Sequence, residues 1–139
     1  MSGVLASEQL IHQLIAEQIE QGIPSSRIIL AGFSQGGVMS LFTGLRYPQS
    51  LAGILAMSCY LPSASSLPSE LSAANKTTSI MQMHGTQDDV VPISAGEDAH
   101  RLLIEAGYNS QWQAYPMAHS VCLEQIQAIS QWIQANCRA

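Results

Sequence analysis

The chain has 139 residues, of which 47% are hydrophobic and only 11% are charged, whereas an ordinary soluble domain carries about a quarter charged residues. This composition excludes intrinsic disorder, which requires low hydrophobicity and high net charge. Five scattered basic residues against ten acidic ones give a net charge of −5, which argues against nucleic acid as a partner. A chain of about this length buries one core rather than two, so we expect a single domain over residues 1–139.

Targeting and metal-binding signals are absent from the sequence. No apolar run approaches the roughly 20 residues that span a bilayer, and residues 1–20 lack the basic start and apolar stretch of a signal peptide. The three cysteines have neither zinc-site spacing nor the density of a disulfide framework. We therefore expect reduced cysteines, no metal, no cofactor, no stable membrane insertion and a cytoplasmic location.

The first half of the chain alternates predicted helices and strands. Apolar residues recur at three- and four-residue intervals over residues 8–21, with Ser7 as a candidate N-cap, which predicts an amphipathic helix ended by Gly22. A continuous apolar strand is expected over residues 27–32 and a helix over residues 35–45. A second buried strand is expected over residues 53–58.

The second half continues the same alternation after a segment rich in proline and serine. That segment, residues 61–76, is expected to be a surface loop or a short helix. The remaining elements are predicted as a strand at 79–84, a helix at 94–106, a strand at 111–115 and a helix at 121–135.

The alternation of strand and helix defines the fold class. Continuous rather than alternating hydrophobicity in the strands predicts a parallel sheet with helices on both faces, an α/β fold. In such sheets, chemistry gathers at the carboxyl ends of the strands. The candidate functional loops are those after Gly32, Ser58, His84 and Tyr115.

A candidate nucleophile lies at the junction of the first strand and the second helix. Residues 32–37, Gly-Phe-Ser-Gln-Gly-Gly, match the pattern Gly-x-Ser-x-Gly, which alone would occur by chance in a few per cent of chains of about this length. The order strand, sharp turn, helix is the context that a nucleophile elbow requires. Ser34 is then the nucleophile, and the backbone N–H of Gln35 lies where an oxyanion would develop. The alternative is that Ser34 merely caps the helix.

A serine nucleophile needs a general base and an acid behind that base. The loop after the third strand, residues 84–92, contains the adjacent acids Asp88 and Asp89, and His119 follows the fourth strand. The chain order serine, aspartate, histidine is that of an α/β-hydrolase.

These segments together resemble the phospholipase/carboxylesterase family of small α/β-hydrolases, which includes acyl-protein thioesterases and bacterial carboxylesterases. The similarity rests on residues 22–28 leading into residues 32–37, on His-Gly-x-x-Asp-x-x-Val-Pro at 84–92, and on His119 followed by serine. The resemblance implies a serine hydrolase that cleaves carboxylic ester or thioester bonds through an acyl-enzyme, with Ser34 as nucleophile, Asp88 as orienting acid and His119 as general base. Asp89 falls at a variable position of the motif, so Asp88 ranks first.

Other residues near strand ends are weaker candidates. By position, Leu61, Met83 and Met117 could line a substrate site, because methionine forms soft, adaptable pocket walls; core packing is the alternative for the two methionines. The resemblance makes His84 a structural residue at the end of its strand.

The resemblance also implies that part of the family's sheet is missing. The family carries several more N-terminal strands and a His-Gly-rich loop that completes the oxyanion hole, and losing one oxyanion donor costs a factor of about 10² to 10³ in turnover. The strand at 27–32 would then be an open apolar edge. We therefore expect either a slow or inactive fragment, or a chain completed by pairing of this edge, for example in a homodimer.

Overall fold

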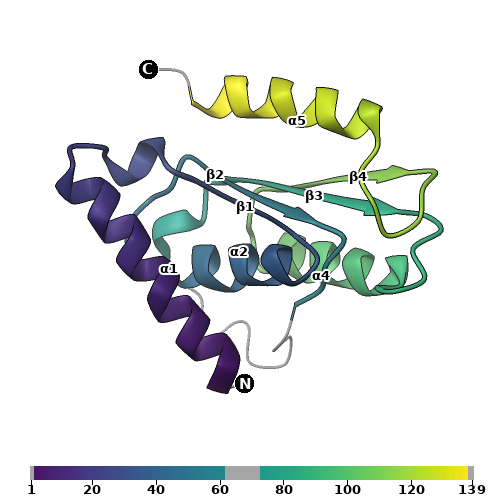
Figure 1. Cartoon of the computed structure of the whole chain (residues 1–139), viewed down its shortest axis with the longest axis horizontal. Helices are drawn as coiled ribbons and strands as arrows, with labels where there is room; N and C mark the ends of the chain where they lie inside the picture. The colour runs from purple at the N-terminus through teal and green to yellow at the C-terminus, as the bar shows by residue number, and fades with distance from the viewer. Residues whose placement is uncertain (1, 62–72, 138–139) are drawn as a thin grey trace.

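The computed structural model describes residues 2–61 and 73–137. Helices and strands alternate along the chain (Figure 1). The elements are α1 (Ser2–Glu20), η1 (Ser25–Arg27), β1 (Ile29–Phe33), α2 (Gln35–Arg46), β2 (Gly53–Met57), η3 (Ala73–Asn75), β3 (Ser79–Gly85), α4 (Ile93–Glu105), β4 (Ser110–Tyr115) and α5 (Leu123–Asn136). The segment expected to be a loop or short helix ends in the single turn η3, and its residues 62–72 lie outside the described part.

The four strands form one parallel sheet in the order β1-β2-β3-β4. Leu30 of β1 is paired with Ile54 of β2, which is paired with Ile80 of β3. Because every strand runs in the same direction, all four carboxyl ends lie at one edge of the sheet, where the following loops meet. The predicted α/β class with a parallel sheet is confirmed.

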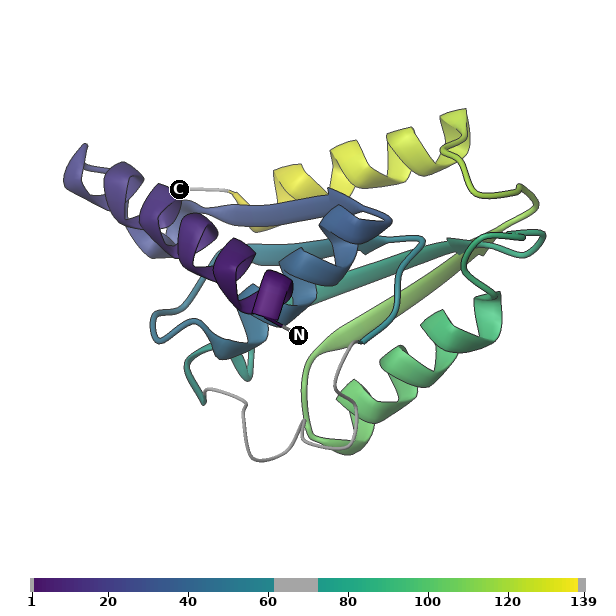
Figure 2. The same ribbon diagram turned by 60° about the horizontal axis from the view of Figure 1, so that its bottom comes forward.

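Helices cover both faces of this sheet, as expected. Figures 1 and 2 show α5 on one face and α2 and α4 on the other, with α1 lying against α2. Successive strand residues point to opposite faces: Ile54 joins the core under α2, whereas Leu55 packs with Trp132 of α5. Two core layers therefore hold the sheet between its helices.

The helix α1 begins earlier than the sequence pattern predicts. It starts at Ser2, so the expected N-cap at Ser7 is wrong. Contacts outside the helix account for the difference, because Val4 is half-buried and Glu8 forms an ion pair with Arg46 of α2 at 2.8 Å. The predicted end is confirmed, with Gly22 at a φ of +100°, a conformation that glycine adopts readily.

A buried asparagine closes the C-terminal end of α2. Asn75 is fully buried, and its Oδ1 accepts the backbone N–H of Leu51 at 2.7 Å. Its Nδ2 donates to the carbonyls of Gly44, Tyr47 and Gln49. The last carbonyls of a helix lack intrahelical partners, so this side chain fixes the end of the helix whose other end follows Ser34.

The strand β1 forms one edge of the sheet, as expected. No strand pairs with its outer side within residues 2–61 and 73–137, and Ala31 in its middle is exposed. On the neighbouring helix α1, Leu10 and Leu14 are 62% and 59% exposed. In the part of the chain that the structure describes, none of the helices combines the length and apolarity needed to cross a membrane.

Candidate active site

Three side chains from three loops at the carboxyl edge of the sheet lie in one hydrogen-bonded line. Ser34 follows β1, Asp88 follows β3 and His119 follows β4. The Oγ of Ser34 is 3.0 Å from Nε2 of His119, and Nδ1 of the same ring is 2.7 Å from Oδ2 of Asp88. The structure thus brings together the three residues that the sequence motifs single out.

The backbone of Ser34 is held in a strained turn. Its φ of 58° and ψ of −118° lie where residues other than glycine are rare. The turn is tight, since a Cβ at Gly32 would lie 2.1 Å from the carbonyl oxygen of Gly36. Ser34 makes no side-chain hydrogen bond to the helix, so the capping alternative is wrong. The turn directs its hydroxyl to His119 instead.

Asp88 is held by its own loop. Its side chain is completely buried, and Oδ1 accepts the backbone N–H groups of Val90 at 2.9 Å and Val91 at 2.8 Å. Burial alone would raise the pKa of Asp88, but the hydrogen bonds from His119 and these two N–H groups outweigh it and hold the pKa below its ordinary value. Asp89 is exposed.

The contacts of His119 determine which nitrogen carries its proton. A carboxylate only accepts hydrogen bonds, so Nδ1 beside Asp88 is the donor and Nε2 presents its lone pair to the hydroxyl of Ser34. The ring also packs against Phe33, with 4.8 Å between the ring centroids. This orientation suits Nε2 to accept the serine proton.

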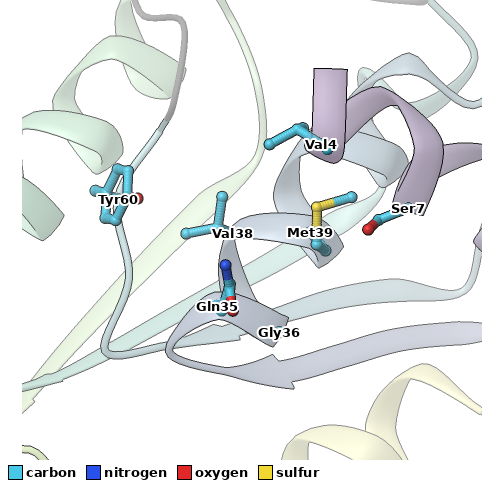
Figure 3. Close-up of a pocket in the computed structure, with 8 residues that line it drawn as sticks. Val4, Ser7, Gln35, Gly36, Val38, Met39 and Tyr60 are labelled. Carbon is cyan, nitrogen blue, oxygen red and sulfur yellow. The ribbon is translucent and has the colours of Figure 1, made fainter. Parts of the chain in front are cut away.

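A hollow of about 540 Å³ lies beside the first turn of α2 (Figure 3). Gln35 is the first residue of that helix, where backbone N–H groups lack intrahelical acceptors and the helix dipole is positive. Apolar side chains from three segments surround the hollow, among them Val4 of α1, Val38 of α2 and Tyr60 after β2. The sequence pattern does not predict these residues, although Tyr60 follows a strand end and that signal could have identified it.

The three predicted substrate residues do not line this hollow. Met83 and Met117 are 1% and 8% exposed and pack in the core with Trp132 of α5, which is the core-packing alternative stated for them. Both methionines lie near strand ends, as predicted, but the alternation of side chains along β3 places Met83 on the face that α5 covers. Leu61 lines a separate hollow of about 270 Å³ against α4.

Residues that could hold a metal ion do not gather anywhere in the described ranges. No group of three or more histidine, cysteine, aspartate or glutamate residues with suitable geometry occurs within residues 2–61 and 73–137.

Known proteins resemble this chain over nearly all of its length. The family model Phospholipase/Carboxylesterase matches residues 1–137. Acyl-protein thioesterase 1 of Neurospora crassa is 43% identical over 137 residues, which cover 95% of this chain and 55% of that protein. A protein of Oryza sativa subsp. japonica named a probable carboxylesterase is 35% identical over 139 residues, covering 99% of this chain and 52% of its own length. The chain thus spans about half the length of these curated relatives.

Solved structures show the same similarity. The crystal structure of SOBER1 from Arabidopsis thaliana superposes with a TM-score of 0.93 at 33% identity, covering 99% of this chain and 66% of that one. The crystal structure of esterase PE8 superposes with a TM-score of 0.89 at 28% identity, covering 97% and 62%. The four-stranded parallel sheet and its helices are therefore those of an α/β-hydrolase.

The strained backbone of Ser34 predicts a stability difference between two variants. Ser34→Gly and Ser34→Ala both lose the hydroxyl, but only glycine adopts the observed φ without strain. We expect the free energy of unfolding of Ser34→Gly to exceed that of Ser34→Ala by about 1 kcal/mol, measured by urea denaturation. An alanine variant at least as stable as the glycine variant would contradict the strain.

The lowered pKa of Asp88 predicts a pH dependence of stability. A carboxylate with a native pKa below its unfolded value of about 3.9 adds stability that is fully present above that pH and is lost as pH falls through the native pKa. The difference in free energy of unfolding between the wild type and Asp88→Asn should stay constant from about pH 7 to 5 and shrink below about pH 4. Asp89→Asn controls for the change in net charge. A difference that widens toward low pH would contradict this sign.

Proposed function

The chain belongs to the phospholipase/carboxylesterase family, and we propose that its residues Ser34, His119 and Asp88 hydrolyse carboxylic ester or thioester bonds. The family is one of hydrolases, and the similar proteins bear the names acyl-protein thioesterase and carboxylesterase. The observation that carries the proposal is the continuous line of hydrogen bonds from the serine hydroxyl through the imidazole to a buried carboxylate.

Acylation follows from this geometry. The Oγ of Ser34 attacks the carbonyl carbon of the substrate while Nε2 of His119 takes the hydroxyl proton, and the carbonyl oxygen becomes an oxyanion. When this intermediate collapses, the bond to the alcohol or thiol breaks and His119 returns the proton to the leaving group. The product of this half-reaction is an ester between Ser34 and the acyl group.

Deacylation repeats the steps with water. His119 takes a proton from the water as its oxygen attacks the acyl carbon, and the second tetrahedral intermediate releases the carboxylic acid while Ser34 Oγ recovers a proton. Asp88 stays ionised throughout at neutral pH, because its pKa lies below the ordinary value. Its carboxylate holds Nδ1–H and stabilises the imidazolium that forms in each half-reaction.

Gln35 supplies the oxyanion donor in this mechanism. Its backbone N–H lies at the N-terminus of α2, directly after the nucleophile, where the helix dipole adds to the stabilisation of negative charge. Loss of one donor of an oxyanion hole costs a factor of about 10² to 10³. Acting with Gln35 alone, the chain would be slower than a two-donor enzyme by about that factor.

The hollow beside Gln35 is our proposed site for the acyl group. It joins the N-terminus of α2 to a wall of apolar side chains that includes Val4, Val38, Met39 and Tyr60. An acyl chain in this hollow would remove apolar surface from water while its carbonyl remains beside Ser34. Substrate binding by Leu61, Met83 and Met117 stays a prediction, as does the cytoplasmic location.

Substitutions in the line of three residues should abolish hydrolysis of p-nitrophenyl butyrate. We expect Ser34→Ala to turn over no faster than buffer, and Asp88→Asn to lower kcat by several orders of magnitude because the imidazole loses its partner and tautomer. Asp89→Asn is the matched control, and its rate should stay near that of the wild type.

Two outcomes would count against this proposal. One is a Ser34→Ala variant that is as active as the wild type, and the other is a larger loss in Asp89→Asn than in Asp88→Asn. The alternative of a catalytically impaired fragment is tested separately with a fluorophosphonate probe, which labels only an activated serine. Labelling of the wild type but not of Ser34→Ala would exclude an inactive site.

The open edge of β1 favours a second proposal, that two copies of the chain pair through this strand. The carbonyl of Ile28 and the N–H of Ser34 both bond to the β2 side. The alternation of a strand therefore turns the backbone groups of Ile29, Ala31 and Phe33 outward, where they can pair with another strand. A second copy, related by a two-fold axis, would place β1 antiparallel to β1 with the same residues contributed by each partner.

Light scattering across a concentration series tests this pairing. We expect the wild type to show twice the monomer mass at tens of micromolar, and Ala31→Pro to remain monomeric because proline removes an outward N–H. Ala31→Ser keeps that N–H and is the matched control. A wild type that stays monomeric at these concentrations would refute the homodimer.

A further inference from the structure

A buried histidine outside the line of Ser34, His119 and Asp88 lies directly beside its acid. His84, the next-to-last residue of β3, has 1% of its side chain exposed. Its Nε2 is 2.8 Å from the carbonyl oxygen of Val91 and 3.5 Å from Oδ2 of Asp88. Nothing in the proposed mechanism uses this side chain.

The neighbours of Nε2 determine its protonation. A backbone carbonyl and a carboxylate are both acceptors, so Nε2 must carry a hydrogen. The 2.8 Å contact with Val91 is an ordinary hydrogen bond, whereas 3.5 Å to Asp88 is beyond the usual range. The positive end of the N–H dipole nevertheless faces the carboxylate.

Val91 connects His84 to Asp88. Its carbonyl accepts from His84, and its N–H donates to Oδ1 of Asp88 at 2.8 Å. A shift of the Val91 carbonyl would therefore disturb the N–H that orients the carboxylate. His84 and residues 88–91 are therefore joined by hydrogen bonds through Val91. The other carboxylate oxygen of Asp88, Oδ2, contacts His119.

The imidazole ring of His84 has little freedom to tilt. A Cβ at Gly96 of α4 would lie 2.5 Å from its Nδ1, so this position requires glycine. On β4, the ring of Trp112 stacks with it at 6.0 Å between centroids and 27° between planes. The ring is thus held between a helix and a strand, with its Nε2 directed at the acid loop.

We propose that His84 is a positioning residue, which orients Asp88 toward His119 by holding the carbonyl of Val91. The effect of His84 on turnover rests on the proposed hydrolase function, whereas the orientation of the Asp88 carboxylate is a property of the fold. The contribution of His84 is geometric: it needs a hydrogen-bond donor at the place of Nε2.

The first experiment uses the wild type. Two-bond ¹⁵N–¹H correlation spectra of ¹⁵N-labelled protein distinguish which nitrogens of each histidine carry hydrogen. We expect a hydrogen on Nε2 of His84. A His84 whose Nε2 carries no hydrogen could not donate to Val91, and that finding would overturn the proposal without any substitution.

The second experiment compares His84→Gln with His84→Met. The two side chains have nearly the same length and shape, but only glutamine offers an N–H donor that can reach the Val91 carbonyl. The readout is the low-field proton resonance of the hydrogen bond between His119 Nδ1 and Asp88, identified by its absence in His119→Ala. We expect the resonance in the wild type and in His84→Gln, and its loss in His84→Met. Trp112→Phe changes the packing on the same ring and should keep the resonance.

The outcomes separate positioning from simple packing. A folded His84→Met variant that keeps the resonance, or a folded His84→Gln variant that loses it, overturns the proposal. If His84→Met does not fold, the Gln variant and the wild-type spectrum decide it. The resonance does not depend on turnover, so a wild type that shows it but hydrolyses no ester would count against the proposed function and leave the role of His84 standing.

Discussion

The site depends on three hydrogen bonds that extend the parallel ladder one residue beyond the strands. The N–H of Ser34 donates to the carbonyl of Met57, the N–H of Ser58 to Met83, and the N–H of Thr86 to Tyr115, each at 2.8 Å. Each bond joins the first residue after one strand to a residue near the carboxyl end of the neighbouring strand. The loops that carry Ser34, Asp88 and His119 are therefore held at one edge of the same sheet, which is how residues 85 positions apart reach hydrogen-bond distance.

Two residues at the same edge of the sheet have energetically unfavourable conformations or contacts. Ser34 and Ser58 are the non-glycine residues with positive φ in the described ranges, and each directly follows a strand. The hydroxyl of Ser58 is also buried without a hydrogen-bond partner among the residues described, which costs about 1 to 3 kcal/mol. A strained backbone of this kind persists only where the surrounding structure holds it in place. Here the hydrogen bonds between the strands and the two core layers hold it.

Much of this arrangement could be predicted from the sequence, because it follows from the order of the strands and helices along the chain and from the periodicity of their apolar residues. Alternating apolar segments predict the parallel sheet, and the sheet places the loops containing Ser34, Asp88 and His119 at one edge. The choice between Asp88 and Asp89 required the resemblance to a family, since spacing alone leaves both open.

The features that the sequence does not predict depend on which face of a strand or helix a side chain occupies. Met83 and His84 are neighbours at the end of β3, and one packs under α5 while the other supports the acid loop on the opposite face. A strand period of two separates them but does not say which face each takes. The start of α1 escaped for a similar reason, because the ion pair of Glu8 with Arg46 is a contact between helices.

Ser34 directly follows the strand that forms the open edge. β1 carries Ser34 at its carboxyl end and is hydrogen-bonded only on the β2 side within the described residues. Edge strands with few buried contacts open more readily than central ones, and any opening of β1 would release the hydrogen bond that holds the strained turn of Ser34. By contrast, His84 lies in β3 and Asp88 follows it, and this strand has a neighbour on each side. Asp88 and His84 thus belong to the part of the sheet that is hydrogen-bonded on both sides, whereas Ser34 follows a strand that is hydrogen-bonded on one side within the described residues.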